Sequence, residues 1–442
     1  MKELLVKQLL NKCLQLPSKT MTKRRNHFLL LFILILAASR ISYAMDGNYI
    51  VVAKDGSGNF KTLTEAINSL PMFNYERVVI FIKNGVYNEK IRITQDYVTL
   101  RGESKDSTII EYSQLRTDWI VDKDPIGPAV INIHADDIVL ENLTIRNTQP
   151  LIGPHAFAIY GTGTRTILLN CKVLSKGGDT ISLWNYKSGM YYHANCTFEG
   201  SVDFVCPRGW CFIKNSKFYE HQKIASLWHA GGFNINQKFV LENCSFDGVK
   251  GFQLGRHHYD AQFYLLNCRF SSNLADTPIY RVVYKADPSK NRPDNWGERD
   301  YYYNCHRTGG DYKWFKNNLK TAAGNPKVNE ITPSWTFDGK WDPESTSGPN
   351  ITKYEIHNGY LLLFFTEPIT VIGSPVINSK TGVVFSYVNG AGSDTIRFNA
   401  DRKFSSKDLS GLLITNSGKL LGTRASVNNR PANLLNKGTS KN

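Results

Sequence analysis

Short runs of β-branched and aromatic residues, separated by turn residues, recur along most of this chain. In these runs apolar residues alternate with polar ones or form brief continuous stretches, which is typical of half-buried or fully buried β-strands. Early examples are Arg77–Lys83, Tyr97–Arg101, Thr108–Glu111 and Asp137–Leu140. The pattern predicts an all-β protein built from many short strands.

One segment near the start of this pattern predicts a helix instead. Leu63–Leu70 follows Thr62 and contains Thr64, both candidate N-caps, and Pro71 ends it. Such a helix would cover the open end of a stack of strands, because an uncovered edge strand invites aggregation.

An Asn-Cys signature recurs along the middle of the chain. Its members are Asn142-Leu143, Asn170-Cys171, Asn195-Cys196, Asn215-Ser216, Asn243-Cys244, Asn267-Cys268 and Asn304-Cys305. The clearest six lie 20 to 37 residues apart, a spacing that fits coils of a parallel β-helix with loop insertions. We predict an inward ladder in which the Asn side chains stack and hydrogen-bond along the axis, while Cys and Phe fill the interior.

The pattern changes near residue 345. Pro343–Pro349 has the composition of a linker. After it come alternating runs without the Asn-Cys mark: Tyr360–Phe365, Ile369–Ile372, Val383–Tyr387, Asp394–Phe398 and Gly411–Ile414. We predict a β-helix domain over residues 45–344 and a small β-sandwich over residues 350–442, which either binds carbohydrate or only spaces and sorts the protein.

Residues 1–44 have the pattern of a secretory signal peptide. A basic segment, Thr22–Arg25, precedes an apolar run of 11 residues, Phe28–Ala38. This run is short for a membrane span, and an uncleaved anchor is the alternative. The apolar run follows Met21 closely. An alternative interpretation is therefore that Met1–Thr20 result from a spurious upstream start codon. We expect a secreted or periplasmic protein with no stable membrane insertion after cleavage.

The charge balance is strongly basic. The leader holds eight Lys or Arg and one Glu, a net charge of +7, which leaves +8 of the total +15 for the rest of the chain. A positive surface attracts an anionic partner over long range. Export argues against nucleic acid, whereas an acidic polysaccharide fits. A charge that serves only solubility is the alternative.

The cysteines do not suggest a disulfide framework or a metal site. Of the 8 in the chain, Cys13 lies in the leader, and an odd number remains. Most follow an Asn, so we interpret them as small buried residues in stacks. Cys206 and Cys211 are close enough in sequence to bridge, but the sequence leaves this open. No Cys or His spacing resembles a zinc site.

His155, Asp179 and Asp203 follow one another at intervals of 24 residues. One coil of a parallel β-helix uses about that many residues, and equivalent positions on successive coils lie about 4.8 Å apart, as neighbouring strands do. The three side chains are therefore expected to form one polar cluster. Two carboxylates at that separation cannot both ionise freely, so we expect their pKa values to split into an acid and a base.

Arg256 is the cation that we expect beside Asp203. Asp203 stands between Val202 and Phe204, and an apolar wall disfavours ionisation unless a cation restores it. An arginine can hold a carboxylate by two parallel hydrogen bonds. We assign Asp203 as an ionised nucleophile and Asp179 as general acid and then base. Taken alone, each Asp is typical of a turn, and the joint spacing favours catalysis.

Five motifs occur in order: Asp55–Thr62, Asn84–Glu89, Gly178–Thr180, Gly200–Phe204 and Leu254–Arg256. Together they resemble the motif series of the pectin methylesterases, in a divergent bacterial-type form, over roughly residues 47–342. The resemblance implies a right-handed parallel β-helix, monomeric and without metal or other cofactor. It would act on methylated homogalacturonan in pectin or on oligogalacturonides.

The resemblance also implies a role for each polar residue. By motif, Asp203 matches the nucleophile, Asp179 the acid/base and Arg256 the residue that orients the nucleophile. Asp203 would attack the C6 ester carbonyl, Asp179 would protonate the departing methanol, and water would cleave the acyl-enzyme.

Four positions depart from the family pattern. His155 and Gly178 stand where the family usually has Gln, whose side chains donate to the oxyanion, and losing one such donor typically costs about 10²–10³ in rate. His155 can donate from a ring nitrogen, although a stacked ladder residue is the alternative. Gly178 leaves the second donor to the main chain or another residue. Pro207 replaces a Gly, and His258 replaces a Trp, which puts sugar stacking there in doubt.

Aromatic side chains elsewhere are candidates to rebuild a platform for the saccharide, since they offer a large apolar face with a polar handle. The candidate substrate-binding residues are Trp184, Tyr186, Trp210, Trp228 and His258. Taken singly, each of the tryptophans and Tyr186 is better explained by packing.

Three other functions remain open at this point. An esterase on a different pectic ester would explain the changed oxyanion and stacking residues. A catalytically inactive β-helix would only bind acidic polysaccharide. A pectate lyase needs clustered carboxylates for Ca²⁺ and a basic residue as proton abstractor, and the motifs argue against it.

Overall fold

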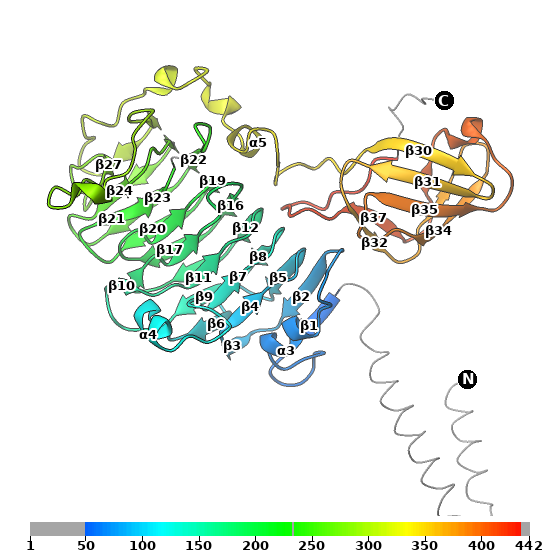
Figure 1. Cartoon of the computed structure of the whole chain (residues 1–442), viewed down its shortest axis with the longest axis horizontal. Coiled ribbons are helices and arrows are strands. Elements are labelled where there is room, and N and C mark those ends of the chain that lie inside the picture. Colours follow the sequence, from blue (N-terminus) through cyan, green and yellow to red (C-terminus); the bar gives the residue numbers. More distant parts are fainter. Residues whose placement is uncertain (1–48, 232–233, 435–442) are drawn as a thin grey trace, which may run out of the picture. The chain divides into compact units, whose positions relative to one another are not determined.

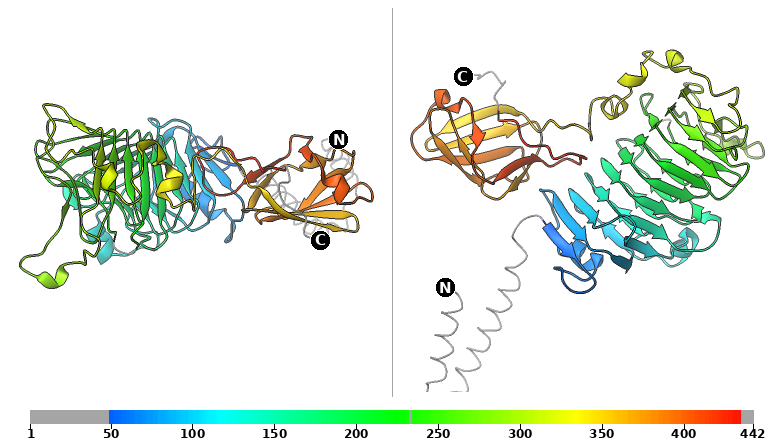
Figure 2. Two further views of the ribbon diagram at one scale, coloured as in Figure 1. Left: turned by 90° about the horizontal axis from the view of Figure 1, so that it is seen from above. Right: turned by 180° about the vertical axis from the view of Figure 1, so that it is seen from behind.

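Three long parallel sheets, wound from successive coils of the chain, form the larger part of the computed structural model (Figure 1). The structure describes residues 49–231 and 234–434, so the predicted signal peptide over residues 1–44 lies outside the described residues. A complete coil contributes one strand to each sheet, and the stack is seen from two further sides in Figure 2. The chain therefore forms a parallel β-helix, as predicted.

The sheets have ten, eight and nine strands. The ten-stranded sheet contains β1 (Tyr49–Val52), β2 (Val78–Ile82), β5 (Val98–Gly102), β8 (Val139–Glu141), β12 (Thr166–Leu169), β16 (Met190–Ala194), β19 (Trp210–Lys214), β22 (Phe239–Glu242), β25 (Phe263–Leu266) and β28 (Asp300–Tyr303). The eight-stranded sheet contains β4 (Ile91–Ile93), β7 (Ile131–Ile133), β11 (Ile159–Gly161), β15 (Ile181–Leu183), β18 (Val205–Pro207), β21 (Ala225–Trp228), β24 (Gln253–His257) and β27 (Tyr280–Arg281). The nine-stranded sheet contains β3 (Gly85–Asn88), β6 (Thr108–Tyr112), β9 (Thr144–Asn147), β13 (Lys172–Leu174), β17 (Thr197–Gly200), β20 (Lys217–Glu220), β23 (Ser245–Gly248), β26 (Arg269–Phe270) and β29 (His306–Arg307). A short pair, β10 (Gly153–His155) and β14 (Gly177–Gly178), lies apart from these sheets.

Helices are few and short. The predicted helix is α3 (Leu63–Asn68), where Thr62 is the N-cap and forms a capping box with Glu65. This helix contacts β1 and β4, the edge strands at this end of the stack, so it covers the end as expected. The others are α4 (Arg116–Val121), α5 (Pro333–Thr336) and the 3₁₀ segments Pro288–Lys290, Leu319–Thr321, Val328–Glu330 and Ser406–Leu409. Within the described ranges, no helix has the length and apolarity to cross a membrane.

The Asn-Cys repeat marks the corner between the ten-stranded and nine-stranded sheets. All seven Asn residues of the series have φ between +50° and +57°, a left-handed conformation that Asn tolerates better than most residues. The amides hydrogen-bond along the axis as predicted, for example Asn170 Nδ2 to Asn142 Oδ1 at 2.7 Å. The predicted inward direction is wrong, because the Asn side chains are partly or fully exposed.

The interior beside this corner is filled by the residues that follow each Asn. The seven cysteines of the described chain are free and buried, so Cys206 and Cys211 do not bridge. Phe198, Phe218, Phe246 and Phe270 form a ladder of rings on successive coils, with centroids 5.3, 4.4 and 5.3 Å apart. The pattern of small thiols and stacked rings explains why the repeat has this sequence.

Antiparallel strands follow residue 350. A six-stranded sheet contains β30 (Ile351–His357), β31 (Tyr360–Phe365), β35 (Thr395–Ala400), β34 (Val384–Asn389), β33 (Val376–Asn378) and β36 (Leu413–Ile414), and β32 (Ile369–Ile372) pairs with β37 (Lys419–Gly422). These strands enclose a hydrophobic cluster of their own. The described residues from Tyr49 onward nevertheless belong to one compact unit, so the division at 344 and 350 stays a prediction.

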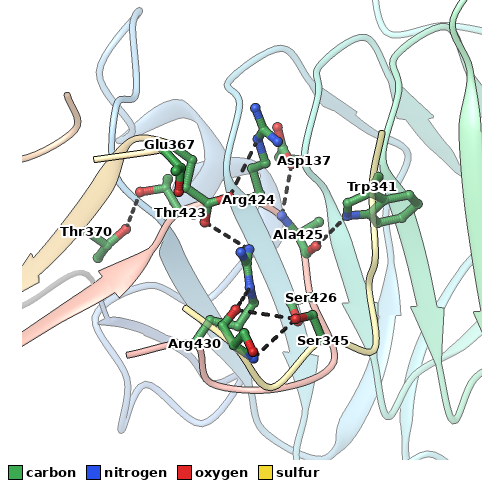
Figure 3. A network of polar contacts seen from close by, with 12 residues as sticks. Asp137, Trp341, Ser345, Glu367, Thr370, Thr423, Arg424, Ala425, Ser426 and Arg430 are labelled. Carbon is green, nitrogen blue, oxygen red and sulfur yellow. Dashed lines mark hydrogen bonds and ion pairs between the residues drawn. The ribbon is translucent and has the colours of Figure 1, made fainter. Parts of the chain in front are cut away.

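The segment after β37 binds to the β-helix through its backbone (Figure 3). The Ala425 N–H donates to Asp137 Oδ1 at 2.9 Å, and the indole N–H of Trp341 donates to the Ala425 carbonyl at 2.9 Å. Arg77 Nη2 donates to the Thr423 carbonyl at 2.8 Å. Buried backbone groups need such partners, so these bonds fix the segment against the ten-stranded sheet.

Candidate active site

The eight-stranded sheet brings Asp179 and Asp203 onto neighbouring coils. Asp179 lies two residues before β15 and Asp203 two residues before β18, and Ile181 pairs with Val205 in the register of these strands. The Asp179 N–H donates to the Val202 carbonyl at 3.1 Å, so the two backbones are in contact. The spacing of 24 residues thus corresponds to equivalent positions on two coils.

His155 lies at the edge of this pair. It ends β10 and is paired in register with Gly178, the residue before Asp179. The distance from His155 Nε2 to Asp179 Oδ1 is 3.5 Å. The His155 side chain is 47% exposed, whereas that of Asp179 is 10% exposed. The structure therefore brings together all three residues of the series, with the imidazole on the solvent side.

Arg256 reaches Asp203 from β24, two strands further along the sheet. Its Nε donates to Asp203 Oδ1 and its Nη2 to Asp203 Oδ2, each at 2.8 Å. The side chains of Asp203 and Arg256 are 12% and 20% exposed. Two parallel charge-assisted bonds fix the carboxylate plane, which a single bond to a lysine could not do.

The electrostatic balance at Asp203 differs from the expectation. Burial raises the pKa of Asp203 to about 6, and the charge of Asp179 acts in the same direction. Arg256 and His155 act to lower this pKa, but burial outweighs them. Asp203 is therefore an anion at neutral pH that gains a proton as the pH falls through about 6. From the sequence we expected Arg256 to outweigh the effect of the apolar surroundings on this pKa.

Asp179 is held by a short chain of side-chain hydrogen bonds. The Ser182 hydroxyl donates to Asp179 Oδ2 at 3.2 Å, and the Trp184 indole N–H donates to Ser182 Oγ at 2.7 Å. The indole therefore orients the hydroxyl, and the hydroxyl orients the carboxyl group. This chain links the candidate acid/base to a candidate substrate-binding side chain.

The backbone under both carboxyl groups is left-handed. Asp179 has φ +55°, Val202 has φ +47° and Asp203 has φ +58°. An Asp tolerates this conformation, but a β-branched residue such as Val202 adopts it rarely and at a cost. Strained backbone of this kind persists where the surroundings hold it, and it is concentrated at functional sites.

Two aromatic groups lie near these residues. The Arg208 guanidinium lies 3.8 Å from the ring centroid of Trp184 and 5.9 Å from that of Tyr186. In the second group, the rings of His258 and of Trp228, which is only 7% exposed, meet edge to face at 4.3 Å. Trp228 is paired in register with Arg256, so this group adjoins the arginine.

Trp210 is not brought to this site. It lies on β19 of the ten-stranded sheet, is 3% exposed, and belongs to a hydrophobic cluster with Phe337 and Trp341. A side chain in that position has no access to a saccharide at the eight-stranded sheet. The aromatic residue type alone could not distinguish it from Trp184.

The site also contains three residues that were not predicted from the sequence: Arg208, Ser182 and Tyr284. Arg208 follows Trp184 by 24 residues, so the same periodicity could have identified it. Tyr284 places its hydroxyl 3.0 Å from His258 Nε2 and comes from a loop that carries no pattern.

Across the described residues, no group of three or more His, Cys, Asp or Glu side chains is arranged to hold a metal ion.

Comparison with known proteins points in one direction. Residues 49–252 match the family model described as pectinesterase. This segment includes His155, Asp179 and Asp203, and it ends before Arg256. The probable pectinesterase/pectinesterase inhibitor 58 of Arabidopsis thaliana is 29% identical over 208 residues, which is 45% of this chain and 35% of the relative. The probable pectinesterase 49 of the same plant is 31% identical over 217 residues, 47% of this chain and 58% of the relative.

The chain spans about a third of the length of the first curated relatives that it matches. Among solved structures, a pectin methylesterase in complex with a hexasaccharide has a TM-score of 0.53 at 23% identity, covering 67% of this chain and 98% of that one. A pectin methylesterase from carrot has a TM-score of 0.51 at 21% identity, covering 66% and 93%. At this identity the structural likeness establishes a shared fold.

Proposed function

We propose that this chain, whose residues 49–252 match the pectinesterase family model, hydrolyses methyl esters of galacturonate residues in pectin. The products are methanol and a free galacturonate carboxylate. The observation that carries the proposal is the carboxylate of Asp203, fixed by two hydrogen bonds from Arg256 and adjacent to Asp179 on the neighbouring coil.

The reaction needs a nucleophile and one group that first gives and then takes a proton. In the proposal, an Asp203 oxygen attacks the C6 ester carbonyl, and the C–O bond to the methoxy group breaks as Asp179 gives it a proton. The resulting acyl-enzyme is an anhydride of Asp203 and galacturonate. Asp179, now ionised, takes a proton from water, and the hydroxide cleaves the anhydride and frees Asp203.

His155 is proposed to donate a hydrogen bond to the oxyanion of each tetrahedral intermediate. Its half-exposed ring lies beside Asp179 and is therefore within reach of the same ester group. Gly178 has no side chain for a second donor. A Cβ there would lie 3.2 Å from the carbonyl oxygens of Gly153 and Val202, so the space of a second side chain is largely filled by backbone.

The proposed partner is methylated homogalacturonan, as pectin or as oligogalacturonides, bound by a monomer that is secreted or periplasmic. The half-buried Trp184 and Arg208 stack beside Asp179, to which Trp184 is linked through Ser182, and they offer an apolar face together with positive charge. Trp228 is 7% exposed, so of the second group only the half-buried His258 is accessible to a saccharide. For the strands after residue 350 we keep both predicted roles, carbohydrate binding and spacing.

Methanol release from highly methylated pectin tests the proposal, with the wild-type protein and Asp203→Asn measured side by side. Release by the wild type and its loss in the variant support the esterase. Unsaturated products that depend on Ca²⁺ would instead indicate a lyase. No product from pectin or methylated oligogalacturonides would favour another ester or a binding protein without catalysis.

A further inference from the structure

Glu220 is a fully buried acid on the coil next to the candidate nucleophile. It ends β20 and has 0% exposure. Its partners in register on the two neighbouring strands are both glycines, Gly200 on β17 and Gly248 on β23. A Cβ on Gly248 would lie 3.0 Å from the Glu220 Cβ. The absence of a side chain at Gly248 therefore leaves room for Glu220.

The Glu220 carboxyl group lies near the turn that carries Asp203, because Glu220 is paired in register with Gly200, three residues before Asp203. Its Oε1 accepts the Gln222 N–H at 2.9 Å. Its Oε2 has no partner of good hydrogen-bond geometry among the residues that the structure describes. A buried carboxyl group with so few partners is costly, so its presence calls for a role.

The turn near Glu220 is the strained one. Val202 and Asp203 are consecutive residues with φ +47° and +58°. Their other backbone contacts are the Asp203 N–H to the Ala225 carbonyl at 2.8 Å and the Asp179 N–H to the Val202 carbonyl at 3.1 Å. Ala225 lies on the next coil, and Asp179 lies on the previous coil. Among the described residues no backbone carbonyl accepts the Val202 N–H, and Glu220 brings a buried carboxyl group to the adjoining coil.

We propose that Glu220 is a positioning residue for the esterase: its buried carboxyl group accepts the Val202 amide and keeps the left-handed Val202–Asp203 turn aimed at Arg256. This inference rests on the proposed function and deepens it. Glu220 does not touch the substrate, and it acts through the conformation of Asp203.

The charge state of Glu220 suits this role. Burial, assisted by the charge of Asp203, raises the pKa of Glu220 to about 9, although Arg256 acts to lower it. At neutral pH the group is an uncharged acid that adds no second negative charge beside Asp203. His221, its sequence neighbour, is directed to Glu199 at 3.8 Å. Above about pH 9, ionisation would place a second anion next to the nucleophile.

Two variants separate positioning from mere packing. Glu220→Leu removes the acceptor, and we expect kcat for methanol release to fall about 10²-fold with little change in KM, since small misplacements of a reacting group cost that much. Glu220→Gln keeps an acceptor oxygen but cannot ionise. This variant should restore most of kcat. In the profile of kcat against pH, its alkaline limb should move from about pH 9, the pKa of Glu220, to a higher pH.

Asp300→Asn is the matched control. Burial raises the pKa of Asp300 to about 8, but this acid lies on β28 of the ten-stranded sheet, away from the candidate site. Its replacement should leave kcat and the alkaline limb where they are. A similar shift in this variant would overturn the proposal, because any acid with a raised pKa would then produce it.

A crystal structure of Glu220→Leu tests the inference without reference to activity. We expect loss of the paired hydrogen bonds between Arg256 and Asp203, or a change of φ at Val202. Retention of both features would overturn the inference even if the wild type is an active esterase. A wild type that releases no methanol would refute the proposed function alone. If the Leu variant does not fold, an unchanged alkaline limb in Glu220→Gln overturns the inference.

Discussion

Arg256 donates two parallel hydrogen bonds, each 2.8 Å long, to the carboxylate of Asp203, although 53 residues separate them in sequence. The contact spans two neighbouring strand pairs, β18 with β21 and β21 with β24. It holds one partly buried anion in a fixed orientation at the centre of the candidate site. Four expectations for the proposed esterase follow from this pair and its surroundings.

The acid limb of the activity profile should report Asp203. The nucleophile must be ionised, and burial raises the pKa of Asp203 to about 6, so kcat/KM should halve near pH 6 and fall about tenfold per unit below it. The measurement is kcat/KM for methanol release as a function of pH. A limb near pH 4, the ordinary range of Asp, would contradict the buried environment described here.

Replacement of Arg256 should separate charge from geometry. Arg256→Lys keeps the positive charge but loses the paired bonds, so kcat should fall about 10²-fold because the carboxylate is no longer fixed. Arg256→Ala also removes the positive charge. Because that charge lowers the pKa of Asp203 in the wild type, the acid limb of the Arg256→Ala variant should move above pH 6. Full activity in Arg256→Lys would show that the planar geometry is unimportant.

His155 should matter for the rate more than for binding. Removing an oxyanion donor typically costs about 10²–10³ in kcat, so His155→Ala should lose activity in that range with a small change in KM. His155→Gln, the residue usual in the family at this position, should recover most of it. Equal and small effects of both substitutions would instead indicate a surface residue with no part in the reaction.

Trp184 and Trp210 form a matched pair of substitutions. Trp184 is half-buried beside Arg208 and linked through Ser182 to Asp179, so Trp184→Ala should raise KM for pectin and lower kcat. Trp210 is 3% exposed in a hydrophobic cluster, so Trp210→Ala should lower the free energy of unfolding by about 3–5 kcal/mol and leave KM unchanged. Chemical denaturation and methanol-release kinetics measure the two effects, and a raised KM for Trp210→Ala would contradict this assignment.

Much of the fold could be read from the sequence because a β-helix is periodic. The Asn-Cys repeat marks a corner that recurs once per coil, and the left-handed backbone at that corner explains why Asn is used there. The helix at Leu63 was predictable from the Thr62 cap and from Pro71. The outward direction of the Asn side chains was not, since periodicity fixes the position of a residue but not the side to which its side chain points.

For the candidate site too, part could be predicted from the sequence and part was decided only by the tertiary structure. Sequence spacing alone placed His155, Asp179 and Asp203 together, because residues 24 apart occupy equivalent positions on successive coils. The distribution of charge depended on tertiary structure, since burial around Asp203 outweighs its arginine partner. Glu220 illustrates the same limit. Its sequence neighbourhood is ordinary, and only the stacking of the coils, with a glycine at the register position on each neighbouring strand, makes it a buried acid on the coil next to the nucleophile.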